Sequence, residues 1–128
     1  MYRQKIEDNR IKSKGWDDMN EKQVILNGNS FDILEHTKKN LSSDNYEQSP
    51  TYEFEFEYGK GYLTVFEKYI SPDVGVASLT LHIRPLGNEQ VELIAIVSGN
   101  SSGIFKIDWL WVGKSIMKTL DKSIEEFK

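Results

Sequence analysis

Residues 51–58 read Thr-Tyr-Glu-Phe-Glu-Phe-Glu-Tyr, a strict alternation of four aromatic side chains with three glutamates. Side chains along a β-strand point alternately to the two faces of a sheet, so this pattern predicts a half-buried strand. We expect the aromatic row to face the core and the glutamate row to face solvent. Gly59-Lys60 then predicts a two-residue turn, and the resulting hairpin would pair Tyr58 with Gly61.

Further β-prone segments extend this hairpin in both directions. Residues 62–70, 76–86 and 90–98 are separated by a loop at 71–75 and a tight turn at 86–89. Local connections of this kind favour an antiparallel meander. A short apolar run at 23–26 adds one more strand, so the sequence predicts an antiparallel sheet of about five strands.

Two helices are expected on one face of this sheet. The first is short, begins after Ser30 as its N-cap, and is followed by a polar loop at 42–50. The second is long and amphipathic, with Asp108 as N-cap and an apolar stripe that runs from Trp109 to Phe127. A helix with one apolar stripe and a sheet with one apolar face bury each other. The predicted fold is therefore α+β.

Charge and length suggest a short arm followed by one domain. The chain has 128 residues and a net charge of −4, yet residues 1–14 contain five basic and two acidic side chains. We expect residues 1–22 to form a basic, flexible arm and residues 23–128 a single domain. The arm holds few aromatic side chains, so it gives no strong signal for nucleic-acid binding. No apolar run is long enough for a membrane span, which favours a cytoplasmic protein.

The scarcity of metal-binding and nucleophilic residue types argues against most catalytic chemistries. There is no cysteine, and His36 and His82 are the only histidines. This composition excludes thiolate zinc sites, iron–sulfur clusters and cysteine nucleophiles. No nucleophile elbow or phosphate-binding loop is present either. We therefore expect no catalytic residues, no metal and no cofactor, and we favour binding over catalysis.

Three short segments carry a resemblance to a known family. They are Val65-Phe66-Glu67-Lys68-Tyr69, then Ala77-Ser78-Leu79-Thr80-Leu81, then Ile107-Asp108-Trp109 after a loop rich in glycine and serine. Over residues 62–113 the sequence resembles a small bacterial family of unknown function. The resemblance implies a plan of strand, helix, meander and closing helix. It implies no activity.

The favoured function is a binding or regulatory module that neutralises or senses a protein partner. Glu53, Glu55 and Glu57 would form an acidic sheet face that attracts a basic protein. Trp109 and Trp111 are two residues apart on a helix and so point about 200° away from each other. With Trp109 on the core stripe, we expect Trp111 to be exposed and to contact a partner or a second copy in a homodimer.

The alternative is a small apolar ligand held between the sheet and the C-terminal helix, as in helix-grip folds. Its cavity would be lined by Tyr52, Glu67, Tyr69 and Trp109. Glu67 lies on the face expected to be apolar, where a carboxylate must be paired, lie at an edge or line a cavity. Such a protein would bind a lipid or aromatic molecule, or act as a small lyase.

Overall fold

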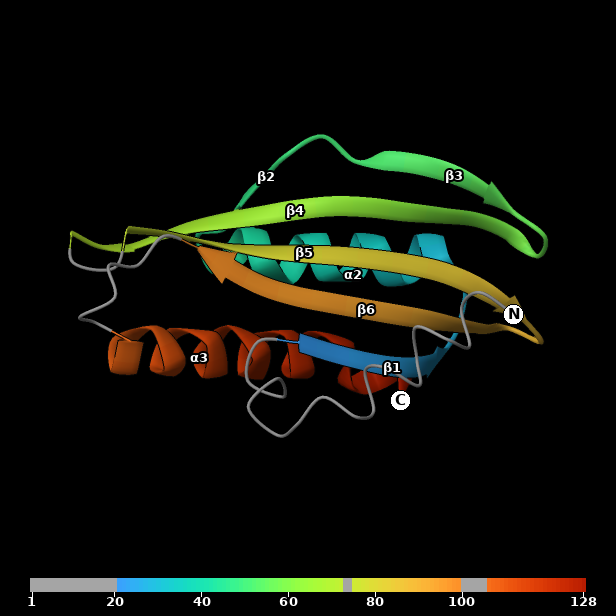
Figure 1. Cartoon of the computed structure of the whole chain (residues 1–128). Helices are drawn as coiled ribbons and strands as arrows, with labels where there is room; N and C mark the ends of the chain where they lie inside the picture. Colours follow the sequence, from blue (N-terminus) through green and yellow to red (C-terminus); the bar gives the residue numbers. More distant parts are fainter. Residues whose placement is uncertain (1–20, 73–74, 100–105) are drawn as a thin grey trace.

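The chain forms an antiparallel sheet with two helices on one of its faces (Figure 1). The computed structural model describes residues 21–72, 75–99 and 106–128, with side chains in the last range described from Trp111 onward. The predicted α+β class, with a long C-terminal helix packed on the sheet, is confirmed. In chain order the elements are β1 (Glu21–Asn27), α2 (Ser30–Ser43), β2 (Glu47–Gln48), β3 (Tyr52–Phe56), β4 (Gly59–Ser71), β5 (Gly75–Gly87), β6 (Gln90–Gly99), α3 (Lys106–Ile124) and the 3-10 helix η3 (Glu125–Phe127).

The sheet contains the predicted meander, and its last strand, β6, pairs with its first strand, β1. Its order is β1-β6-β5-β4-β2, and β3 pairs with the same edge of β4 as β2 does. The described residues thus form six strands where about five were expected. The additional strand, β2, lies inside the predicted loop 42–50, where Glu47 pairs with Glu67 and Ser49 N donates to Val65 O at 2.8 Å.

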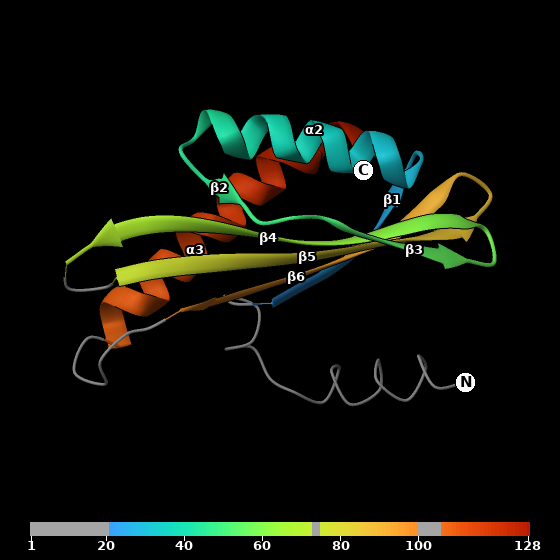
Figure 2. The same ribbon diagram turned by 90° about the horizontal axis from the view of Figure 1, so that it is seen from above.

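Both helices lie on one face of the sheet, and the core lies between them and that face (Figure 2). The strand β5 defines the face most clearly, because its alternate residues are fully buried. The largest fully buried side chains are Phe66, Leu26, Ile33, Leu41, Leu79, Leu81, Ile83, Leu93, Leu120, Ile124, Val91 and Val112. They come from both helices and from strands β1, β4, β5 and β6, so the core is one continuous layer.

The predicted position of the aromatic row was wrong. The turn of the hairpin is formed by Glu57 and Tyr58, so that Phe56 pairs with Gly59 and Tyr52 with Leu63. This register places the row on the face of the sheet that no described helix covers. Tyr52 is 63% exposed and Phe54 is 42% exposed.

The cause of this error is that β4 is apolar on both faces. Phe66 points to the helices and is fully buried, whereas its neighbour Val65 points to the opposite face. Periodicity in β4 therefore does not decide which face is the core. Its partner β5 does, because Leu79 is buried opposite Phe66 while Thr80 is paired with Val65. Glu67, on the face of Val65, is exposed rather than facing the core.

The ends of the helices differ slightly from the prediction. Asn29, not Ser30, caps α2, since its Oδ1 accepts a hydrogen bond from Asp32 N at 2.8 Å. Ser30 instead donates its hydroxyl proton to Lys60 O at 2.5 Å, which ties the start of α2 to β4. The helix α3 begins at Lys106, two residues before the expected cap.

Candidate functional site

The residues proposed for ligand binding do not line one cavity. Tyr52 and Glu67 are exposed on the helix-free face of the sheet. Tyr69 lies on the same face, at the end of β4, and the side chain of Trp109 lies outside the described residues. The structure thus separates Tyr52 and Glu67 from the space between the sheet and α3. Their assignment to a ligand stays a prediction.

The three glutamates proposed for partner binding lie together at the free edge of the sheet. Glu53 and Glu55 are exposed on β3, and Glu57 is exposed in the turn that follows. Among the described strands, β3 pairs with β4 alone. Residues 52–60, which form β3 and its turn into β4, hold three acidic side chains and one basic side chain. The basic group, Lys60, lies 2.9 Å from Glu53, and this contact raises the pKa of Lys60.

Trp111 lies far from these glutamates. It belongs to α3, is 66% exposed, and borders a cleft beside Lys68 and Ile70 at the end of β4. Glu53, in contrast, pairs with Tyr62. Ile70 lies eight residue positions beyond Tyr62 on β4, which corresponds to roughly 26 Å of strand. Trp111 and the glutamates therefore belong to two different surfaces.

The helix-free face of the sheet gathers most of the exposed apolar side chains. Of the nine large hydrophobic residues that are exposed in the described chain, six lie on this face by strand register: Ile25, Tyr52, Phe54, Tyr69, Val76 and Ile96. The six residues are spread over five strands, and polar side chains such as Glu67, Thr80 and His82 lie between them on the same face. Two of the six, Tyr52 and Phe54, belong to β3, the strand that also carries the acidic edge.

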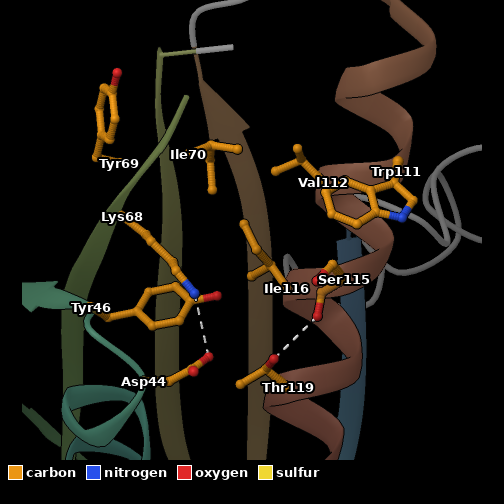
Figure 3. A pocket seen from close by; sticks show the side chains of 10 residues that line it. All are labelled: Asp44, Tyr46, Lys68, Tyr69, Ile70, Trp111, Val112, Ser115, Ile116 and Thr119. Atoms are coloured by element: carbon orange, nitrogen blue, oxygen red, sulfur yellow. Dashed lines mark hydrogen bonds and ion pairs between the residues drawn. The ribbon is translucent and has the colours of Figure 1, made fainter. Parts of the chain in front are cut away.

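A cleft of about 210 Å³ opens between the end of β4, the C-terminal end of α2 and the first half of α3 (Figure 3). Three of its polar groups, on Asp44, Tyr46 and Lys68, meet on the side of α2 and β4. The facing wall is formed by α3. The complete lining is Asp44, Tyr46, Lys68, Tyr69, Ile70, Trp111, Val112, Ser115, Ile116 and Thr119.

The polar side of this cleft is organised around the Lys68 ammonium group. Its Nζ lies 3.5 Å from Asp44 Oδ2 and 4.9 Å from the centre of the Tyr46 ring, over the ring face. Tyr46 is buried, and burial together with the nearby Asp44 carboxylate raises its pKa to about 12. The Tyr46 hydroxyl therefore stays protonated and can donate a hydrogen bond.

The α3 wall combines apolar and hydroxyl groups. Val112 and Ile116 are buried in the core cluster, and Ile70 of β4 packs against the same cluster. Thr119 donates its hydroxyl proton to Ser115 O at 3.2 Å, which leaves its oxygen able to accept (Figure 3). The cleft thus offers an apolar wall facing charged and hydroxyl groups, the usual composition of a small-molecule site.

The sequence-based alternative placed a cavity between the sheet and the C-terminal helix, and one of its proposed residues, Tyr69, lines this cleft. The charged pair was not predicted, because Asp44 fell in the predicted loop 42–50 and Lys68 was assigned to no site. Asp44 and Lys68 are 24 residues apart, and their contact depends on the end of α2 lying beside β4. No spacing rule in the sequence marks such a contact.

A second, wider hollow of about 570 Å³ lies at the opposite end of the sheet, beside the start of α2. Much of its wall is turn backbone. It is lined by Gly28, Asn29, Ser30, Phe31, Tyr58, Gly59, Lys60, Tyr62, Pro85, Gly87, Asn88, Glu89, Gln90 and Val91. In the described residues, no group of three or more histidine, cysteine, aspartate or glutamate side chains has the arrangement of a metal site. No described helix combines the length and apolarity of a membrane span.

The protein is therefore an antiparallel sheet with two helices packed on one face. Its candidate sites are the acidic edge formed by β3 and the small cleft between β4 and α3. The chain belongs to the family of unknown function DUF6054, whose model matches residues 19–128. The expected resemblance to an uncharacterised family is confirmed and extends well beyond residues 62–113. No curated protein matches the sequence.

Proposed function

We propose that this protein is a non-enzymatic binding module that holds a basic, extended segment of a partner protein along the β3 edge. The observation that carries the proposal is the coincidence of charge and open backbone. Glu53, Glu55 and Glu57 are exposed on the strand and turn that form the free edge of the sheet. Residues 52–60 hold these three glutamates and one lysine, Lys60.

An unpaired edge strand presents backbone N–H and C=O groups to any strand that approaches it. Glutamates along the edge repel a second copy of the same edge and attract a strand that carries lysine or arginine. β-Strand addition then supplies affinity through main-chain hydrogen bonds and specificity through alternate side chains. A basic segment of alternating character matches both properties of β3.

The aromatic row supplies the apolar part of the contact. Tyr52 and Phe54 are exposed on the helix-free face, and the glutamates that alternate with them on β3 point to the opposite face. An added strand would place its basic side chains near the glutamates and its apolar side chains near the aromatic rings. Aromatic side chains contribute much of the binding energy in protein interfaces.

A direct test uses two strand-forming peptides and the full chain. One peptide alternates lysine with valine, and the reference peptide alternates glutamate with valine. We expect the basic peptide alone to bind, to perturb the backbone NMR signals of β3, and to bind more weakly as salt screens the charges. Replacement of Glu53, Glu55 and Glu57 by lysine should weaken binding at least about tenfold, because each charged contact is worth about 1 kcal/mol or more.

The matched control replaces Glu35, Glu125 and Glu126 by lysine. These three acids are exposed on α2 and η3, so the net charge changes equally while β3 is untouched. Circular dichroism establishes that both variants fold. Equal loss of binding in both variants would show that net charge alone controls binding, and this would contradict the proposal. Equal affinity for the two peptides would also contradict it.

A further inference from the structure

The cleft between β4 and α3 holds one cation and one anion that are only loosely joined. Lys68 Nζ and Asp44 Oδ2 are 3.5 Å apart, a long distance for a charged hydrogen bond. Within the described chain, Asp44 is the one carboxylate that contacts Lys68, and Lys68 the one ammonium that contacts Asp44. A lysine has three N–H donors and a carboxylate has several acceptor positions. Both groups therefore keep capacity for a ligand.

The equal and opposite charges of this pair select what can bind between them. A ligand with only a negative charge would approach Lys68 but be repelled by Asp44, and a ligand with only a positive charge would meet the reverse. A zwitterion satisfies both groups and leaves the cleft neutral. In an α-amino acid the ammonium nitrogen and the carboxylate group are bonded to the same α carbon, so the two charges are close enough together to contact Asp44 and Lys68 at the same time.

The size and apolar wall of the cleft indicate the side chain of the ligand. Its volume of about 210 Å³ equals roughly seven water molecules at about 30 Å³ each. This is smaller than the roughly 300–1,000 Å³ of pockets for drug-sized ligands. Ile70, Val112 and Ile116 form the apolar wall beside the charged pair. The space therefore suits a molecule of about the size of leucine.

From these features we infer that the cleft binds a free α-amino acid with a leucine-sized apolar side chain. Its carboxylate contacts Lys68, its ammonium contacts Asp44, and its side chain lies against Ile70, Val112 and Ile116. The Tyr46 hydroxyl donates a further hydrogen bond to the carboxylate. This site is independent of the β3 edge, because it uses the opposite end of β4.

The inference is tested by titrating the full chain with L-leucine. Binding is measured by calorimetry and by the NMR signals of Lys68, Ile70 and Ile116. Three partial ligands divide the contributions: 4-methylpentanoate lacks the ammonium, isopentylamine lacks the carboxylate, and glycine lacks the side chain. We expect saturable binding of leucine and affinity at least about tenfold weaker for each partial ligand, since a hydrogen bond to a charged group contributes about 1.5–3 kcal/mol.

Variants of the charged pair complete the test. Lys68→Met and Asp44→Asn should each weaken leucine binding at least about tenfold, while Lys68→Arg should retain most of it. The matched control is Lys60→Met. It removes the β4 lysine that forms an ion pair with Glu53, and it should leave leucine binding unchanged. The inference is overturned if leucine shows no saturable binding below about 10 mM. It is also overturned if either singly charged partial ligand binds as tightly as leucine.

Discussion

The ring of Phe56 lies over the backbone of Gly61. A β carbon built on Gly61 would come within 2.8 Å of Phe56 Cδ2 and 2.7 Å of the carbonyl oxygen of Ile83, both closer than real contacts allow. Glycine inside a strand normally weakens it, and here its place is explained by an aromatic ring that covers it. The contact also fixes the register of the hairpin, since it requires Phe56 to pair with Gly59.

Replacement of Gly61 by alanine should therefore destabilise the protein, although alanine is usually the better residue in a regular element. We expect a loss of about 1–3 kcal/mol in the free energy of unfolding, because the ring and the β5 backbone must move. Urea denaturation measures it. In a chain that already carries Phe56→Ala, Gly61→Ala should lower the free energy of unfolding by less than it does in the unmodified chain. Strictly additive effects of the two substitutions on stability would contradict the contact.

The helix-covered face is the core, so two phenylalanines on opposite faces of the sheet should differ strongly in their contribution to stability. Phe66→Ala removes a fully buried ring and should cost about 3–5 kcal/mol. Phe54→Ala removes a ring that is 42% exposed on the helix-free face and should cost less than about 1.5 kcal/mol. Denaturant midpoints of the two variants compare their stabilities directly. A larger loss for Phe54→Ala than for Phe66→Ala would contradict the assignment of the core to the helix-covered face.

The buried Tyr46 should make the protein less stable at high pH. Its pKa is raised to about 12 by burial and by Asp44, against about 10 in the unfolded chain. Above pH 10 the unfolded state loses its phenolic proton first, so the free energy of unfolding falls as pH rises from 10 towards 12. The full loss would approach about 2–3 kcal/mol. Tyr46→Phe should remove this part of the pH dependence, and ultraviolet titration of tyrosinate measures the pKa itself.

A second pH dependence should arise from His82 on the helix-free face. Burial and the neighbouring Arg84 lower its pKa below the ordinary value of 6.5, while Glu92 acts in the opposite direction. Below pH 6.5 the unfolded state binds this proton more readily, so the protein loses stability as pH falls from about 7 to 5. Thermal unfolding of His82→Gln over this range should show a shallower slope, and an identical slope would contradict the assignment.

One buried hydroxyl offers a stabilising substitution. The Thr37 Oγ1 atom in α2 is fully buried and has no hydrogen-bond partner among the described residues. Burial of an unpaired hydroxyl is unfavourable, and valine has nearly the same shape without it. Thr37→Val should raise the free energy of unfolding by about 1 kcal/mol. A lower melting temperature in calorimetry would show that the hydroxyl has a partner in solution.

The sequence was sufficient for five of the six described strands and for both α-helices, but not for β2 or for the choice of core face. Regular alternation in β3 and in β5 located both strands, and the apolar stripe located the last helix. The aromatic row of β3 was assigned to the core because Phe54 and Phe56 resemble core residues by residue type. Leu79 and Leu81, which alternate with Thr80 and Ser78, carry the decisive pattern, because β5 lies in the middle of the sheet and its buried apolar residues mark the covered face.

The candidate sites were predictable to different degrees. The glutamates of the β3 edge lie in one continuous stretch, so their alternation was visible directly. The ligand-site prediction included one residue of the cleft, Tyr69, and missed the charged pair, because Asp44, Lys68 and Ile116 come from three separate elements. Their approach depends on how α2 and α3 cross the sheet, and single-sequence periodicity carries no information on that crossing.

The pairing of β1 with β6 has a consequence for how the chain folds. Glu21 lies opposite Ile96, and Lys22 contacts Asp121 of α3 at 3.0 Å. The first strand therefore finds its sheet partner only after β6 has been made, and Lys22 finds Asp121 later still. Contacts between residues so far apart in the sequence slow folding, because the long loop between them must close before they form.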